Sequence, residues 1–176
     1  MLYTRDGDKG TSGLFGTKRL SKDNPVFEAL GTVDELNSLL GICRARSNKM
    51  NDALITNEIL KVQECLFIIQ AELAGVPKSL GQCHIDSLEQ TIEGFESEIA
   101  NLHSFVIPGA TELSALFDYT RAVSRRAERS VIAVRSGTLV SPETLAYLNR
   151  LSSFLYALAR YSVVKEGKKE ISPSYS

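Results

Sequence analysis

The segment from Arg121 to Arg129 reads R-A-V-S-R-R-A-E-R and holds four arginines and one glutamate. On a helix with about 100° per residue, Arg121, Arg125 and Arg129 share one sector with Glu128. Like charges at this spacing repel by a few tenths of a kcal/mol per pair, which an anion bound between them would offset. Guanidinium groups suit carboxylates and phosphates. A solvated basic face, with Glu128 as its local counter-charge, stays open as the alternative.

A second polar stretch precedes the first predicted helix. From Tyr3 to Lys22 it reads Y-T-R-D-G-D-K-G-T-S-G-L-F-G-T-K-R-L-S-K, with glycine at every third position from Gly7 to Gly16. Glycines let the backbone approach an anion and direct several N–H groups at it, which suits a polyphosphate. The stretch is not a P-loop or a dinucleotide fingerprint, because those motifs and their preceding strand are absent. A mobile arm without a ligand is the alternative.

The composition is that of one globular domain. The chain has 176 residues, 43% hydrophobic and 23% charged, with a net charge of −1. Such a chain buries roughly 70% of its unfolded surface, so we expect a single domain over residues 1–176. The near-neutral charge argues against nucleic acid and anionic membranes as partners.

Cysteine and histidine usage predicts neither a disulfide framework nor a metal site. Cys43, Cys65 and Cys83 are scattered and odd in number, which is typical of reduced thiols in the cytoplasm. With two histidines, a histidine-based metal site is not expected. No apolar run approaches the roughly 18 residues of a membrane span, and the N-terminus lacks the apolar core of a signal peptide.

Helical periodicity dominates the rest of the chain. Asn24, Thr111 and Ser141 are placed to begin helices, and Asp86 with Glu89 resembles a capping box for another. Short links favour antiparallel neighbours, so the expected fold is an all-α bundle of about five helices. We expect the polar tail from 167 to 176 to be frayed. The expected helices run from Val26 to about Ser47, over 53–75, from Asp86 to about Leu102, from Glu112 to about Arg135, and from Pro142 to about 166.

Five segments occur in a characteristic order. They are T-R-D-G-D-K-G-T-S in the arm, G-T-V-D-E-L-N at 31–37, F-V-I-P-G at 105–109, R-A-V-S-R-R-A-E-R at 121–129 and Y-L-N-R-L-S at 147–152. Together they resemble the PduO-type ATP:cob(I)alamin adenosyltransferase family, also called corrinoid adenosyltransferases, from Tyr3 to about Tyr161.

The resemblance implies a five-helix bundle of the cobalamin adenosyltransferase type with a glycine-rich N-terminal arm. It implies a homotrimer with active sites at subunit interfaces, where the arm wraps the ATP of a neighbouring subunit. The implied reaction moves the 5′-deoxyadenosyl group of ATP to the cobalt of cob(I)alamin, with Co(I) as nucleophile and Mg²⁺ accompanying the nucleotide. The products are adenosylcobalamin and triphosphate. The implied partners are a reductase and an adenosylcobalamin-dependent enzyme.

Residue roles follow from the same resemblance. Asp34 and Arg121 match a pair that bridges subunits and shapes the site, and Phe105 matches the aromatic residue that displaces the lower axial ligand of the corrinoid. With Arg125 these are the implied catalytic positions, and no protein ligand to a metal ion is implied. The implied ATP-binding positions are Thr4, Arg5, Asp6, Gly7, Ser12, Gly13, Lys22, Arg125, Arg126, Ala127, Glu128, Arg129 and Asn149.

The chain departs from the family pattern at three places. Ala110 follows Pro108-Gly109 where many members have a second glycine, Asp6 stands where threonine is frequent, and Gly13 replaces a larger residue. These changes affect the fine contacts of the arm and one turn, not the reaction. Two other functions stay open. One is a carrier or sensor that binds ATP and corrinoid with little turnover, and the other is a helical scaffold with an unrelated anion site.

Overall fold

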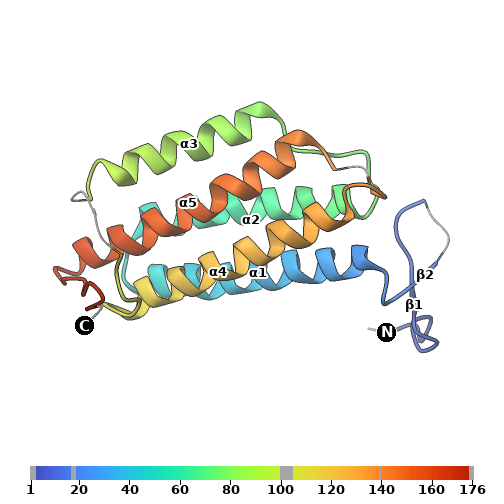
Figure 1. Cartoon of the computed structure of the whole chain (residues 1–176), viewed down its shortest axis with the longest axis horizontal. Helices are drawn as coiled ribbons and strands as arrows, with labels where there is room; N and C mark the ends of the chain where they lie inside the picture. The colour runs from blue at the N-terminus through green and yellow to red at the C-terminus, as the bar shows by residue number, and fades with distance from the viewer. Residues whose placement is uncertain (1–2, 17–18, 100–104, 139, 175–176) are drawn as a thin grey trace.

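The computed structural model describes residues 3–16, 19–99, 105–138 and 140–174. Within them the body of the protein is built from helices α1 (Pro25–Lys49), α2 (Ala53–Leu73), α3 (Gln82–Glu96), α4 (Glu112–Val134) and α5 (Pro142–Lys165). The helices lie lengthwise beside one another (Figure 1). The predicted all-α bundle is therefore confirmed.

Three helix starts were predicted correctly from their capping residues. The side chain of Asn24 accepts the N–H of Val26 at 3.1 Å, and Pro25 follows as the first residue of α1. The Thr111 hydroxyl accepts the N–H of Ser114 at 3.2 Å, and Ser141 caps α5 in the same way. Each cap satisfies an N–H group that the first helical turn leaves without a partner.

The predicted start of α3 was wrong. The helix begins at Gln82, four residues before Asp86, and ends at Glu96 instead of near Leu102. His84 supplies the cap, because its Nδ1 accepts the N–H of Gly81 at 3.0 Å. Asp86 instead accepts a hydrogen bond from Gln82 within the first turn.

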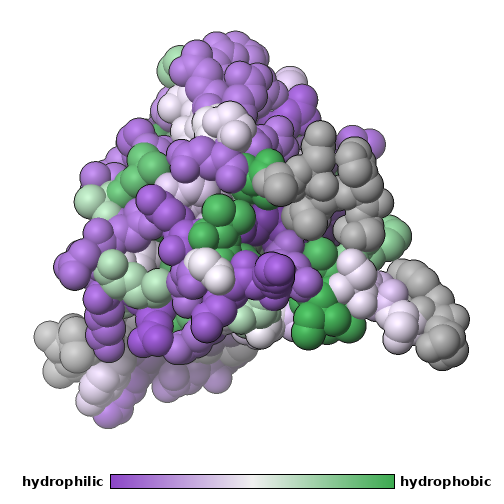
Figure 2. All heavy atoms as spheres, turned by 90° about the vertical axis from the view of Figure 1, so that its left-hand side faces the viewer, coloured by the Kyte–Doolittle hydropathy of each residue, from purple (hydrophilic) through white to green (hydrophobic). Residues whose placement is uncertain are grey.

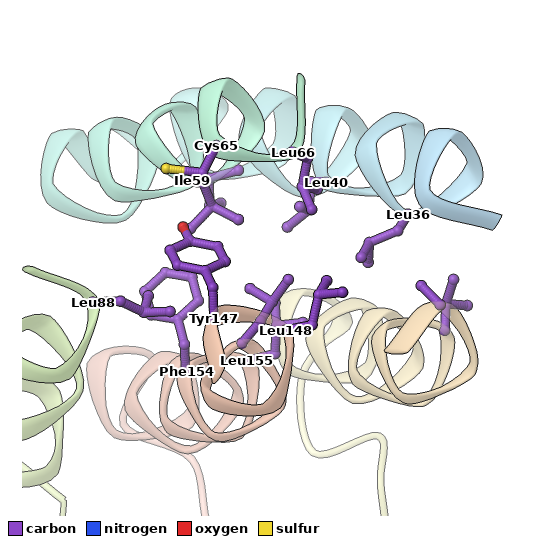
Figure 3. Close-up of a cluster of buried hydrophobic side chains, with 14 of the residues drawn as sticks. Leu36, Leu40, Ile59, Cys65, Leu66, Leu88, Tyr147, Leu148, Phe154 and Leu155 are labelled. Carbon is purple, nitrogen blue, oxygen red and sulfur yellow. The ribbon is translucent and has the colours of Figure 1, made fainter. Parts of the chain in front are cut away.

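The core lies between α1, α2, α4 and α5, with α3 packed against α5. Tyr147 of α5 is buried, and its hydroxyl points toward the Cys65 thiol of α2 (Figure 3). Burial raises the pKa of both groups, so both stay protonated at neutral pH. The same core contains fully buried aliphatic side chains from α1, α2 and α5; they include Leu36, Leu40, Ile59, Leu66, Leu148 and Leu155.

The tail was predicted to be frayed, and this is wrong for Gly167 to Ile171. Gly167, with φ +62°, turns the chain back after α5, while the N–H of Lys168 donates to the Val163 carbonyl at 3.0 Å. The Ile171 carbonyl then accepts the N–H of Ile107 at 2.8 Å, in an isolated antiparallel bridge. The tail thus touches the segment that leads into α4.

The N-terminal arm carries two short strands that the sequence did not predict. Strand β1 (Thr11–Ser12) pairs antiparallel with β2 (Leu20–Ser21). The arm projects beyond the end of the bundle at which α1 begins (Figure 1). Among the helices of the described ranges, none combines the length and apolar character that a membrane crossing requires.

Candidate functional site

The arginine face of α4 comprises Arg121, Arg125, Glu128 and Arg129, with Arg126 beside it. Arg125, Arg126 and Arg129 are exposed, whereas the opposite side of the helix is buried, as the periodicity predicted. Ala127 lies on that buried side with 0% exposure. Although Ala127 is one of the predicted nucleotide-binding positions, its side chain therefore cannot contact a ligand.

Two carboxylates organise this face. Glu35 of α1 forms an ion pair with Arg126 and raises the pKa of its guanidinium by hydrogen bonding and charge. The Glu128 Oε1 atom accepts a hydrogen bond from Asn149 Nδ2 at 3.2 Å, which joins α4 to α5. The Asn149 side-chain oxygen Oδ1 accepts in turn from Arg150 Nη1 at 2.9 Å. The structure thus brings together Glu128 and Asn149, which were predicted from segments 21 residues apart.

The arm is held in shape by Arg19, which the sequence analysis did not single out. Its Nη2 donates to the carbonyls of Asp6 at 2.7 Å and Thr11 at 2.8 Å, and its Nε donates to the Thr11 hydroxyl at 3.1 Å. One planar guanidinium, just before β2, therefore joins β1 to the turn that precedes β1. The only sequence signal was an arginine among turn residues, which does not reveal the carbonyls it contacts.

Several predicted arm residues lie close together. The Lys22 N–H donates to the Gly10 carbonyl at 2.9 Å, and a Cβ on Gly7 would stand 3.0 Å from Lys22 Nζ. Glycine at position 7 therefore leaves room for the ammonium group. The Thr4 hydroxyl accepts from the Asp6 N–H at 3.4 Å, and Arg5 adopts a positive φ of 64°. Of the other two arm positions, Ser12 lies in β1 and Gly13 is exposed.

The arm is attached to the bundle at the end of α2. The Phe15 N–H donates to the Ala74 carbonyl at 2.8 Å. Gly75 has φ +87°, and a Cβ there would stand 3.1 Å from the Phe15 carbonyl oxygen, so the approach favours glycine. The described part of the arm extends past the bundle instead of along α4 (Figure 1), so the described residues of one chain do not close a site between the arm and the arginine face.

Asp34 and Arg121 are not paired within the chain. Asp34 Oδ1 accepts a hydrogen bond from Gln70 of α2 at 3.2 Å. The Arg121 guanidinium lies over the Tyr156 ring of α5, 5.9 Å from its centroid. Its Nε is buried and has no hydrogen-bond partner within the described residues.

Phe105 lies in the connection that precedes α4, and its side chain is 80% exposed. This connection belongs to the end of the bundle opposite the arm (Figure 1). Figure 2 views that end and shows hydrophobic groups among hydrophilic ones on its surface. Phe105 therefore does not serve the core of its own chain.

One cavity between helices contains none of the predicted site residues. It has a volume of about 240 Å³, lies between α2 and α3, and is lined in part by Cys65, Cys83, His84 and Tyr147. Most of the predicted residues have exposed or partly exposed side chains outside this cavity, so cavity shape alone does not identify the site. Within the described ranges, no three His, Cys, Asp or Glu side chains are grouped as ligands for a metal ion.

Comparison with known proteins places these residues in a family. A family model described as cobalamin adenosyltransferase matches residues 2–162. The chain belongs to this family. It is 40% identical over 166 residues to the corrinoid adenosyltransferase of Citrobacter freundii, covering 90% of this chain and 93% of that one. It is 35% identical over 179 residues to corrinoid adenosyltransferase MMAB of Homo sapiens, covering 96% and 71% respectively.

Solved structures support membership of the PduO-type branch of cobalamin adenosyltransferases. The fold matches a phenylalanine-to-alanine variant of the Lactobacillus reuteri PduO-type ATP:corrinoid adenosyltransferase, complexed with cobalamin and ATP. The TM-score is 0.92 at 28% identity, over 98% of this chain and 99% of that chain. An arginine-to-lysine variant of the enzyme from the same species, complexed with ATP, matches with a TM-score of 0.91 at 30% identity, over 98% and 100%.

Proposed function

We propose that this member of the cobalamin adenosyltransferase family transfers the 5′-deoxyadenosyl group of ATP to the cobalt of cob(I)alamin. The observation that carries the proposal is the family match over residues 2–162, together with relatives named corrinoid adenosyltransferases that align with 90% or more of the chain. The products are adenosylcobalamin and triphosphate.

The nucleotide site combines the arginine face of one subunit with the arm of a neighbour. Arg125, Arg126 and Arg129 supply exposed guanidinium groups that bind phosphate oxygens. Glu128 and Asn149, already hydrogen-bonded, present an oriented amide to the nucleoside. The arm adds Lys22 and its neighbouring backbone N–H groups. Because the site is shared between two subunits, an arm that projects from its own bundle can reach the arginine face of a neighbour.

The remaining arm positions act mainly through the backbone. Gly7 and Gly13 let the chain come close to the triphosphate, and Thr4, Ser12 and Arg5 add donors around it. Mg²⁺ would accompany the nucleotide and neutralise part of its charge. Within the described residues of one chain, no three His, Cys, Asp or Glu side chains are grouped to hold it.

The reaction needs no acid or base from the protein. The Co(I) electron pair attacks the ribose C5′, the Co–C bond forms, and the C5′–O bond to triphosphate breaks with its electron pair on oxygen. The corrinoid carries the difficult chemistry, and the protein holds C5′ in line with cobalt. Arg125 stabilises the departing triphosphate, because a preorganised cation favours charge that develops in the transition state.

Phe105 serves the corrinoid side of the reaction. A reductase partner must deliver one electron to Co(II), and removing the lower axial ligand makes this reduction easier. The exposed Phe105 side chain is free to fill that face of the corrin and exclude water and ligand. The product passes to an adenosylcobalamin-dependent enzyme.

We propose a homotrimer in which Asp34 and Arg121 pair between subunits. Two observations support this assembly. Asp34 is exposed, and the Arg121 Nε is buried but unpaired in the described residues of one chain. Large apolar side chains also remain exposed on α1 and α2, including Ile42 at 56% and Phe67 at 66%, and an interface would bury them. Sedimentation as a monomer at assay concentration would contradict the trimer.

One assay tests the function. Protein, ATP, Mg²⁺ and chemically reduced cobalamin are mixed, and adenosylcobalamin is followed by its absorbance. Catalytic formation over many turnovers is the expected result. Product limited to one equivalent per site indicates a carrier or sensor, and no spectral change indicates a scaffold with an unrelated anion site. Arg135→Ala, an exposed substitution at the end of α4, is the matched control for Arg125→Ala in this assay.

A further inference from the structure

The C-terminal segment from Gly167 to Ile171, here called the C-terminal strap, makes a specific contact with the Phe105 segment. The N–H of Ile107 donates to the Ile171 carbonyl at 2.8 Å. Phe105 precedes Ile107 by two residues, and its exposed side chain has little packing of its own to hold it. The position of Phe105 therefore depends on how the backbone around Ile107 is held.

A buried ion-pair cluster fixes the strap to the bundle. Arg160 of α5 is 3% exposed, and its Nη2 donates to Asp118 Oδ2 of α4 at 2.5 Å. On its other side, Arg160 Nε lies 2.5 Å from Oε1 of Glu170, whose side chain is 12% exposed. Glu170 thus joins the strap to α5 through Arg160, which in turn joins α5 to α4 through Asp118. Without Glu170, Arg160 would keep Asp118 as its ion-pair partner, but the strap would lose this side-chain contact with α5.

The same cluster reaches Arg121. The Arg160 guanidinium lies 4.9 Å from the centroid of the Tyr156 ring, and Arg121 approaches that ring to 5.9 Å. Contacts therefore continue from Arg121 through Tyr156 and Arg160 to Glu170. Ile171 follows Glu170 and is hydrogen-bonded to the backbone before α4, so Arg121 and the Phe105 segment both adjoin this cluster.

We propose that Glu170 is a positioning residue for the adenosyl transfer: with Arg160 it anchors the C-terminal strap, and the strap sets the position of Phe105. The inference rests on the proposed function, since it assigns Glu170 an effect on the corrinoid that acts only through Phe105. Loss of the strap should weaken handling of cob(II)alamin and leave the ATP site intact.

The test compares full-length protein with a chain ending at Lys169 and with Glu170→Gln. A chain ending at Pro173 is the matched control, because it keeps Glu170 and Ile171. Hydrogen exchange of the Ile107 amide gives a readout that needs no activity. We expect exchange at least about tenfold faster in the chain ending at Lys169, with the control unchanged. If the exchange rate is unchanged, the strap does not restrain the backbone at Ile107 and the proposal is wrong.

Kinetics provide the second readout. Turnover from cob(II)alamin with a reductant should fall about tenfold in both strap variants, while the KM for ATP stays within about twofold. The electron paramagnetic resonance spectrum of cob(II)alamin bound with ATP should show less of the species without a lower axial ligand. Equal loss of ATP affinity and turnover would indicate a general structural role and contradict positioning.

A double variant separates action through Phe105 from independent action. In a Phe105→Ala background, deleting the strap should cause no further loss of turnover, because the group it positions is gone. If the turnover of the double variant instead falls by the product of the two single-variant losses, the strap acts independently of Phe105 and the proposal is wrong. If the full-length protein forms no adenosylcobalamin, the proposed function fails, whereas the Ile107 exchange still decides whether the strap fixes this segment.

Discussion

The two regions proposed to bind ATP differ in how their shape is maintained. The arginine face belongs to a helix of 23 residues whose other side is embedded in the core, with Ala127 and Val131 at 0% exposure. The arm has mostly exposed residues and is held by backbone turns, two strands of two residues each and the Arg19 guanidinium.

The two regions should therefore differ in how much conformational entropy they lose when ATP binds. The guanidinium groups on α4 are presented by a framework that exists without ligand, so binding to them needs little ordering. The arm has no core of its own, and each contact that Arg19 makes is worth about 1 kcal/mol net. Substitutions on the helix should therefore act on the chemical step or on global stability, and substitutions in the arm on ATP affinity.

Arg125→Ala should have the largest effect. Removing one preorganised cation from the departing triphosphate should lower turnover at saturating ATP by about 100-fold. The melting temperature should barely change, since Arg125 is exposed. Steady-state kinetics and calorimetry check both. If only the KM for ATP changes, Arg125 contributes to ATP affinity, as proposed for the arm, and not to the chemical step.

Ala127→Leu tests the framework behind the arginine face. Ala127 is fully buried, so a larger side chain should overpack the core and lower the free energy of unfolding by about 1–3 kcal/mol. Urea denaturation measures this. Ala122→Leu is the control on the exposed side of the same helix and should change stability by less than about 0.5 kcal/mol. Equal effects would show that α4 is not rigidly packed at Ala127.

Arg19→Ala tests the arm. Losing the three hydrogen bonds of the guanidinium should raise the KM for ATP about tenfold, with turnover at saturation and melting temperature unchanged. Arg19→Lys keeps the charge but not the planar fork, so it should resemble the alanine variant. Full recovery by lysine would mean that charge, and not the loop geometry, is what the arm needs from this residue.

Glu35→Gln should have the smallest effect. It releases Arg126 from an ion pair between half-exposed side chains, and solvent screening makes the contribution of such a pair small. The KM for ATP should fall by no more than about threefold, with Glu93→Gln on α3 as the control. A tenfold rise would instead indicate that the pair itself builds the nucleotide site.

Much of the fold was predictable from local sequence, because caps and periodicity act over a few residues. Asn24, Thr111 and Ser141 identified three helix starts, and the side of α4 that carries Val123 and Val131 was correctly predicted as buried. The start of α3 was missed, since Gly81 with His84 is an unusual cap, whereas Asp86 and Glu89 form a common capping pattern that the helix does not use. Capping statistics cannot choose between competing local partners.

The candidate site was predictable only in part. The ordered motifs indicated Glu128 and Asn149, and the structure joins them across two helices. No local pattern indicated that Arg19 folds back onto Asp6 and Thr11. Ala127 was included with its neighbours as a site residue, although helical geometry turns its side chain into the core. Motif membership names a segment, and packing decides which side chains in it face a ligand.

The sequence by itself determined the helical pattern, the buried side of α4, and a family resemblance carried by segments spread along the chain. Only the tertiary structure decided which charged groups meet: Arg126 with Glu35, and Arg160 with Asp118 and Glu170. It also decided that a tail expected to fray is hydrogen-bonded to the segment that follows Phe105. The physical reason is range, because periodicity and caps depend on neighbours within one or two turns. Pairings between distant residues depend on how whole helices pack, which no short stretch of sequence specifies.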